Sequence, residues 1–198
     1  DSSSSAKARD PKLEYHHVPL LDASKYWWVD STPPGSSAFD NQCRNPACGF
    51  EGNPTHGNTI KEGVNRASVE TPIYCLQCQA LLPRPVVIDD GQTRLMKGFT
   101  SAYKRMRGDL PASALTRNLS YACSDQKLHP TQNRVLSLLE AMMLHTITDY
   151  DYQWKLPSGK KASDKLIRES IGESIPPRGL EVIFRNIFRV VFNYDLSN

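Results

Sequence analysis

The sequence has no long apolar run, almost no net charge and no recognisable catalytic motif. No stretch approaches the 18 apolar residues that a membrane span needs. Its 24 basic and 21 acidic side chains leave a net charge of +3, so affinity for a polyanion would have to come from a local patch. Glycine-rich dinucleotide loops, phosphate-binding loops, zinc-hydrolase helices and nucleophile elbows are absent. Enzymatic activity is therefore unsupported, although many active sites leave no local pattern.

Cysteine is scarce, and its spacing is informative. Five cysteines are an odd number, which argues against a fully paired disulfide framework. Four of them form two close doublets, Cys43-x4-Cys48 and Cys75-x2-Cys78, while Cys123 stands apart. Two such doublets can hold one tetrahedral zinc ion, and residues 40–82 resemble a zinc ribbon. Four thiolates close the coordination shell, so we predict one structural Zn²⁺ ion.

Two alternatives to this zinc site stay open from the sequence. The doublets could form disulfides in a secreted protein. One cysteine could instead be idle, with His56 or His129 taking its place as a ligand. At the predicted zinc site, the aromatic neighbours Phe50 and Tyr74 are expected to shield the sulfurs.

The chain divides by composition into three parts, and we predict an α+β fold. Residues 1–13 are polar and serine-rich, which predicts a disordered arm. Residues 14–90 predict a zinc-stapled loop and β lobe, with strands within 14–30 and at 86–88. Residues 91–198 predict a mainly helical region onto which that lobe packs.

Helical periodicity predicts several helices in the second half. The first covers 92–107 and ends before Gly108, a short one is expected at 111–118, and a long one begins at Thr131. Ser163 is expected to cap a further helix, and 179–194 is apolar nearly all round, which predicts a central core helix. The apolar face of the first helix consists of Leu95, Phe99, Ala102, Tyr103 and Met106.

Three polar or aromatic features carry weaker hypotheses. The predicted 92–107 helix presents a basic face that could contact phosphates, formed by Arg94, Lys97, Lys104 and Arg105. A solvated helix face is the plainer interpretation. His145 and Asp149 lie four residues apart, which favours a hydrogen bond at a helix end over catalysis. Trp27 and Trp28 are expected to be buried, with an exposed interaction surface as the alternative.

The whole profile resembles small secreted effectors of plant-pathogenic, rust-type fungi. The resemblance is carried by the small size, the serine-rich start with no visible leader, the absence of a catalytic signature, and the doublets in Asn-Gln-Cys43-Arg-Asn-Pro-Ala-Cys48 and Tyr-Cys75-Leu-Gln-Cys78. It implies a zinc-stabilised, non-enzymatic virulence protein that is secreted, delivered into the host cytoplasm or nucleus, and acts through protein–protein interaction. The alternatives are a zinc-containing nucleic-acid-binding protein that uses the basic helix 92–107, and a hydrolase with an unrecognised site.

Overall fold

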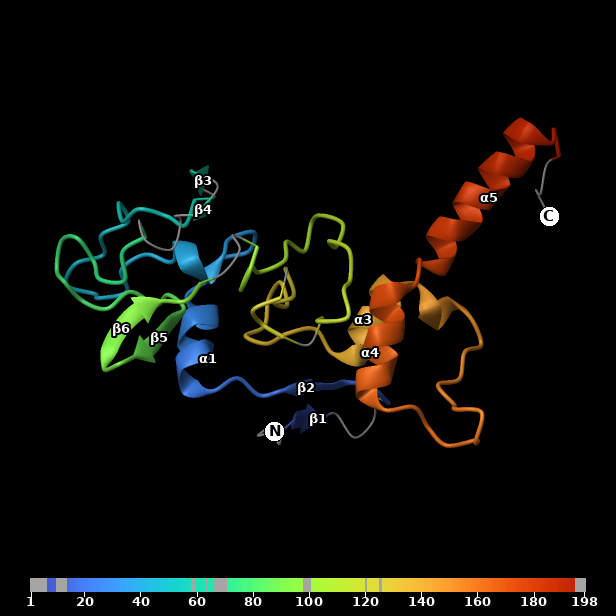
Figure 1. The fold of residues 1–198 in the computed structure, drawn as a ribbon, viewed down its shortest axis with the longest axis horizontal. Coiled ribbons are helices and arrows are strands. Elements are labelled where there is room, and N and C mark those ends of the chain that lie inside the picture. The colour runs from blue at the N-terminus through green and yellow to red at the C-terminus, as the bar shows by residue number, and fades with distance from the viewer. Residues whose placement is uncertain are drawn as a thin grey trace.

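The structure is a computed structural model that describes residues 7–9, 14–57, 60–62, 64–65, 71–97, 101–119, 121–124 and 126–194. Helices and short antiparallel strand pairs alternate with long irregular segments (Figure 1). The strand pairs are β1 (Lys7–Arg9) with β2 (His17–Pro19), β3 (Ile60–Lys61) with β4 (Val64–Asn65), and β5 (Val86–Asp89) with β6 (Gln92–Leu95). The helices are α1 (Ala23–Asp30), α3 (Leu138–Leu144), α4 (Asp164–Glu173) and α5 (Pro177–Val191). The predicted mixed fold, with cysteines in the first half and helices in the second, is confirmed.

The β5–β6 hairpin replaces the first part of the predicted 92–107 helix. Asp90 and Gly91 both have positive φ angles, 48° and 75°, which is the geometry of a two-residue hairpin turn. The turn reverses the chain, so that Gln92 pairs with Asp89 and Leu95 with Val86. Among the described residues after Leu95 there is no helix until α3, so the 92–107 helix and the short 111–118 helix were wrong predictions.

A first core joins the two halves of the chain around α1. Asp22 caps this helix by accepting a hydrogen bond from the Lys25 backbone N–H. The sequence predicted strands within 14–30, but residues 23–30 are helical. Trp28 is buried against Tyr103, with ring centroids 5.8 Å apart, while Trp27 is partly exposed. Burial was thus predicted correctly for one of the two tryptophans. The core also contains buried side chains from both predicted parts, 14–90 and 91–198. They are Val18, Phe39, Leu95, Leu128 and Val135.

A second core lies between α3 and α4. Ser137 and Glu140 form a reciprocal capping box at the start of α3, so the helix begins later than the predicted start at Thr131. Ser163 caps α4 as predicted. Leu138 and Met142 of α3 pack with Ile167 and Ile171 of α4, and Leu119, from the irregular segment before α3, is buried in the same core. In the region predicted to be helical, the described residues between 101 and 135 form no helix, and the first helix there starts at Leu138.

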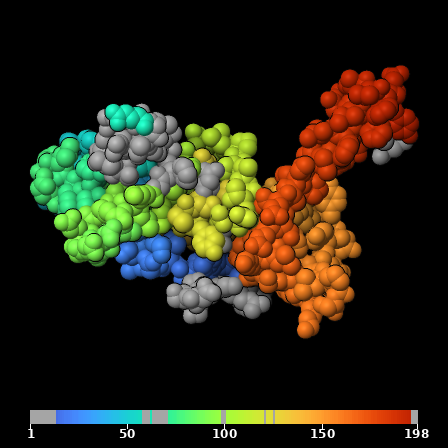
Figure 2. Space-filling model, viewed as in Figure 1, coloured from blue at the N-terminus to red at the C-terminus, as the bar shows by residue number. Residues whose placement is uncertain are grey.

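The last helix, α5, stands away from the rest of the molecule (Figure 1, Figure 2). None of its residues is buried, so the prediction of a central core helix was wrong. Among the described residues, no helix is long and apolar enough to cross a membrane.

At the opposite end, residues 7–9 of the predicted disordered arm form β1. The other residues of that arm, 1–6 and 10–13, lie outside the described residues.

Candidate metal centre

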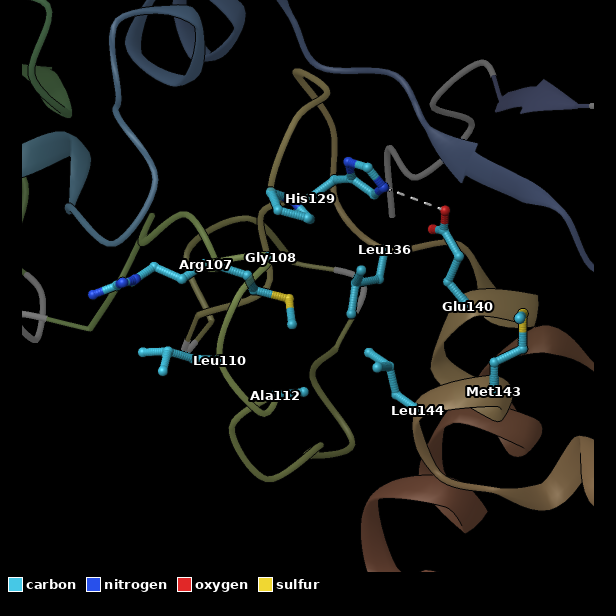
Figure 3. Close-up of a pocket in the computed structure, with 11 residues that line it drawn as sticks. Arg107, Gly108, Leu110, Ala112, His129, Leu136, Glu140, Met143 and Leu144 are labelled. Carbon is cyan, nitrogen blue, oxygen red and sulfur yellow. Dashed lines mark ion pairs between the residues drawn. The ribbon is translucent and has the colours of Figure 1, made fainter.

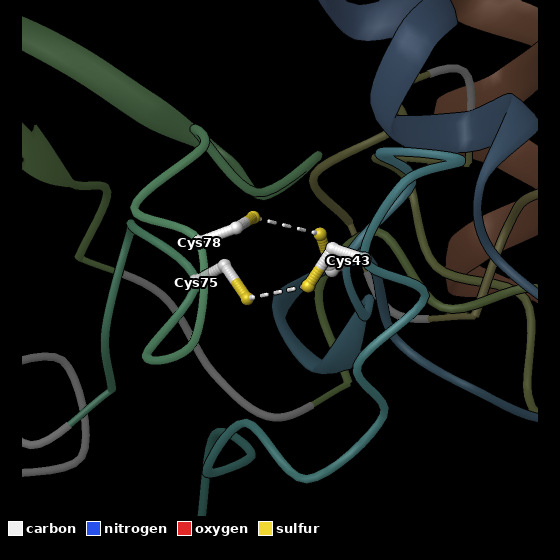
Figure 4. Close-up of side chains that lie close together, drawn as sticks. Cys43, Cys75 and Cys78 are labelled. Carbon is white, nitrogen blue, oxygen red and sulfur yellow. Dashed lines mark hydrogen bonds between the residues drawn. The ribbon is translucent and has the colours of Figure 1, made fainter.

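Four cysteines from two separate loops converge on one point. The ligand atoms of Cys43, Cys48, Cys75 and Cys78 all lie within 4.8 Å of one another. The Cys43 and Cys78 sulfurs are 3.6 Å apart, and those of Cys48 and Cys75 are 3.9 Å apart (Figure 4). All four are free thiols at these distances, so the disulfide alternative does not describe this structure.

The two doublets reach this point with matching backbone geometry. The residue after each second cysteine, Gly49 and Gln79, has a left-handed backbone with φ angles of 58° and 59°. The backbone N–H of Gln79 donates to the Cys75 carbonyl, and that of Gly49 donates to the Asn45 carbonyl. These tight turns point both sulfurs of each doublet to the same side.

Hydrogen-bond donors to the Cys75 sulfur favour its thiolate form. The Asn53 amide donates to the Cys75 sulfur at 3.7 Å, and the Asn45 amide donates to the Cys78 sulfur at 3.8 Å. Burial raises the pKa of the Cys75 thiol, but the backbone N–H groups of Cys78 and Gln77 and the Asn53 amide outweigh it and lower the pKa to about 6. The backbone N–H of Phe50 lowers the pKa of Cys48, but burial and the three other sulfurs outweigh it and raise that pKa to about 12. A thiolate is the form that binds a metal ion.

The donor set fits one tetrahedral ion of the zinc type. Zinc–sulfur bonds of about 2.3 Å at tetrahedral angles place two sulfurs about 3.8 Å apart, close to both measured separations. Four soft ligands leave no open position, which is the pattern of a structural site.

The surroundings of the sulfurs match the prediction only in part. Phe50 and Leu82 pack against the cysteines, whereas Tyr74 is exposed. Neither alternative ligand belongs to the cluster. His56 stacks on Phe39, and His129 accepts hydrogen bonds from the backbone of Thr131 and Gln132.

A buried arginine stabilises the loops beneath the cysteines. Arg84 is fully buried and donates to the backbone carbonyls of Asn41, Pro54 and Pro72 at 2.8 Å each. It therefore joins segments on both sides of the first doublet to the segment that leads into the second. Sequence reasoning missed this residue, because an arginine among loops looks like an exposed charge.

The four residues of the predicted basic face do not share one helix. Arg94 lies on β6 and binds Asp89, while Lys97 is exposed after the strand. Lys104 is half-buried, and its backbone forms an isolated antiparallel β-bridge with Ser37. Arg105 is only 4% exposed and donates to the carbonyls of Val29, Thr32, His129 and Gln132 and to the Asn133 amide oxygen. Arg105 is a structural residue.

The remaining candidate residues lie apart from the metal centre. The ring of His145 is buried and bonds to the Ser174 hydroxyl at 2.8 Å, while Asp149 pairs with Arg178 at 3.0 Å. His145 and Asp149 therefore each bond to another residue, and not to one another as the spacing suggested. Cys123, which stands apart in the sequence, is exposed and lies outside the four-cysteine cluster.

A hollow of about 260 Å³ lies between the 106–112 loop and α3 (Figure 3). Its walls are mostly apolar, with Met106, Leu110, Leu136 and Leu144, and the 3.6 Å His129–Glu140 pair lies on one edge. Glu140 also accepts from Arg134 and from the Ser137 backbone, so its carboxylate has a structural role.

The fold and the site together define a mixed α/β protein with a four-cysteine metal-type centre. No protein-family description matches the chain, and no solved structure matches it. The chain is similar to the Type II methyltransferase M1.HgaI of Avibacterium volantium, with 37% identity over 102 residues. The match covers 47% of this chain and 27% of the relative, so the chain spans only about a quarter of that protein's length.

This similarity corrects the functional expectation. The prediction of a non-enzymatic effector was wrong, because a relative at 37% identity is a methyltransferase. Neither alternative, a nucleic-acid-binding protein built on helix 92–107 or a hydrolase, matches that relative either. Nothing in the similarity supports a virulence role, secretion or a host protein partner.

Proposed function

We propose that this chain works in a DNA methyltransferase, as a DNA-facing part whose first half is shaped by a zinc ion. The observation that carries the proposal is the 37% identity with a Type II methyltransferase over 102 residues. DNA is the substrate class that this name suggests.

Zinc is the ion proposed for the four-cysteine centre. The sulfurs are spaced for tetrahedral thiolate coordination, and soft thiolates select zinc over magnesium or calcium. The ion would hold residues 41–85 in shape and would leave methyl transfer to other groups, since four thiolates leave no position for a substrate.

The experiment replaces the matched segment of the Avibacterium volantium enzyme with this chain and measures methyl transfer to DNA. Labelled S-adenosylmethionine serves as the methyl donor. The hybrid enzyme is expected to label DNA, and Cys75→Ser is expected to lower the rate at least tenfold, because the lobe then loses its metal (about 10–16 kcal/mol of binding energy in zinc peptides). Cys123→Ser is the matched control and should keep the rate.

DNA binding by the unaltered chain is a second test, which does not depend on the hybrid enzyme. Affinity for a duplex, followed by fluorescence anisotropy, should fall as salt rises, because phosphate contacts release counterions. A folded, zinc-loaded hybrid that leaves DNA unlabelled, together with a chain that shows no salt-dependent binding, contradicts the proposal.

A further inference from the structure

Three aromatic side chains form a ridge on the loop between α3 and α4, which is the orange loop before α4 in Figure 1. This aromatic ridge consists of Tyr150, Tyr152 and Trp154, and its two tyrosines are 44% and 57% exposed. Trp154 is half-buried, and its indole N–H donates to the Met142 sulfur at 3.0 Å, which anchors the ridge on α3. The Tyr152 and Trp154 rings meet at 64° with centroids 4.7 Å apart, so they do not cover each other face to face.

Two hollows open beside the aromatic ridge, and all three of its rings line both of them. The larger hollow, of about 380 Å³, is completed by residues that include Tyr15 and Leu139. The smaller, of about 200 Å³, is completed by residues that include Ser174 and Ile175. A hollow with aromatic walls accepts a flat, unsaturated group that can stack on a ring.

A hairpin with three lysines follows the ridge directly. Lys155 and Lys161 pair as an isolated antiparallel β-bridge, and the turn between them carries Lys160. Every residue of this lysine hairpin, 155–161, is exposed. Lys161 pairs with Glu14, whereas Lys155 and Lys160 have no ion-pair partner among the described residues. Two ammonium groups are therefore available for a negatively charged ligand.

The acidic residues of the same loop do not cancel this charge. Asp149 is paired with Arg178 at 3.0 Å, and Asp151 is exposed. Lys155 and Lys160 thus stand against one exposed carboxylate in the described segment 150–161. Free lysines beside exposed aromatic rings suit a ligand that carries both phosphates and flat rings.

We infer that the aromatic ridge and the lysine hairpin bind single-stranded DNA, with bases against the rings and backbone phosphates against the lysines. This inference rests on the proposed function, from which it takes DNA as the ligand. An unpaired base offers a flat π face to an aromatic side chain, whereas in a duplex both faces of each base are covered by neighbouring base pairs. Duplex DNA would therefore meet the lysines but could not stack on Tyr150 or Tyr152.

The test compares two DNA probes by fluorescence anisotropy at one salt concentration. The first is a labelled oligothymidylate of about 12 nucleotides, and the second is the same strand in a duplex. We expect the unaltered chain to bind the single strand at least about tenfold more tightly than the duplex. Tyr152→Ala should weaken single-strand binding about fivefold or more, and Tyr152→Phe, which keeps the ring, should retain it. Tyr194→Ala is the matched control, because Tyr194 is 60% exposed and lies beyond α5.

The lysine hairpin is tested through the salt dependence of single-strand binding. Replacing both Lys155 and Lys160 with alanine should flatten the slope of log affinity against log salt by about 1.4, since each lost phosphate contact removes about 0.7. Lys97→Ala changes an exposed lysine near β6 and should leave the slope unchanged. An unaltered slope in the double variant would contradict the role of the hairpin.

Two further outcomes overturn the inference. One is equal binding of the single strand by Tyr152→Ala and by the unaltered chain, and the other is a duplex that binds as tightly as the single strand. Displacement of the strand by an equal concentration of thymidine monophosphate would assign the hollows to a free nucleotide and contradict the inference as well.

The hybrid enzyme of the proposed function separates the two claims. Labelled DNA without single-strand binding contradicts this inference alone. Single-strand binding that depends on Tyr152, with neither labelled DNA nor salt-dependent duplex binding, contradicts the proposed function alone.

Discussion

The loops around the four cysteines (the metal lobe, within residues 41–85) and the packed helices α3 and α4 (the α3–α4 body) are stabilised in different ways. Around the cysteines the buried apolar set is small, Cys43, Cys75 and Leu82, and the loops are joined by the sulfur cluster and by Arg84. Between α3 and α4, by contrast, aliphatic side chains such as Leu138, Ile167 and Ile171 are fully buried. A segment with few apolar residues can hold a fixed shape if a metal ion and a buried arginine replace the hydrophobic core.

The strongest test of this contrast is a pair of substitutions. Cys75→Ser should remove the ion and unfold residues 41–85 while α3 and α4 keep their hydrogen-exchange protection, because zinc binding energy is folding energy in such sites. Ile171→Ala should do the reverse, destabilising α3 and α4 by about 2–5 kcal/mol with the metal retained. Uniform loss of protection in both variants would mean that the two regions fold as one unit.

Arg105→Lys is expected to have the next largest effect. Lysine cannot reproduce the planar fork that binds four backbone carbonyls and the Asn133 side chain, so buried acceptors lose their partners. We expect a loss of about 3 kcal/mol in the free energy of unfolding, measured by urea denaturation. Arg94→Lys, at an exposed ion pair with Asp89, is the control and should change stability by less than about 1 kcal/mol.

The acid sensitivity of the α3–α4 body should depend on Glu140. Burial raises the pKa of Glu140, but Arg134 and the Ser137 backbone outweigh it and lower the pKa to about 2. Because the folded pKa lies below the unfolded value of about 4.3, the stabilisation is complete above pH 4.3 and is lost as the pH falls toward 2. Glu140→Gln should lower stability at pH 6 by about 1–3 kcal/mol and flatten the decline below pH 4. An unchanged pH profile of urea unfolding would contradict this assignment.

Cys123→Ser should have the smallest effect. The side chain is exposed and lies apart from the metal cluster, so the free energy of unfolding should change by less than about 0.5 kcal/mol. Bound metal should be unchanged. A loss of metal in this variant would place Cys123 in the coordination shell.

The sequence predicted the parts of the structure that depend on local signals. Doublet spacing was enough to find the four cysteines, and Ser163 identified the start of α4, because both signals depend on residues close together in the chain. The 92–107 helix failed because apolar spacing was given more weight than the Asp90-Gly91 turn signal, which would have predicted the hairpin. Leu95, Ala102 and Tyr103 are buried as expected, but by an irregular chain.

Other features could not be read from the sequence, because they depend on distant partners. Arg84 and Arg105 bind carbonyls of segments far away along the chain, and no local pattern distinguishes them from surface arginines. The apolar composition of α5 indicates burial, but it does not say whether the cover lies within this chain. The methyltransferase similarity carries no local motif that sequence reasoning recognised.

Elemental analysis combined with thiol counting on the purified chain tests the central claim most directly. Cys43, Cys48, Cys75 and Cys78 should hold about one zinc ion per chain. In the native protein Cys123 alone should react quickly with a thiol reagent, and all five cysteines should react after chelation. A metal-free, folded protein whose four cysteines are oxidised to disulfides, or react freely without a chelator, would contradict the account.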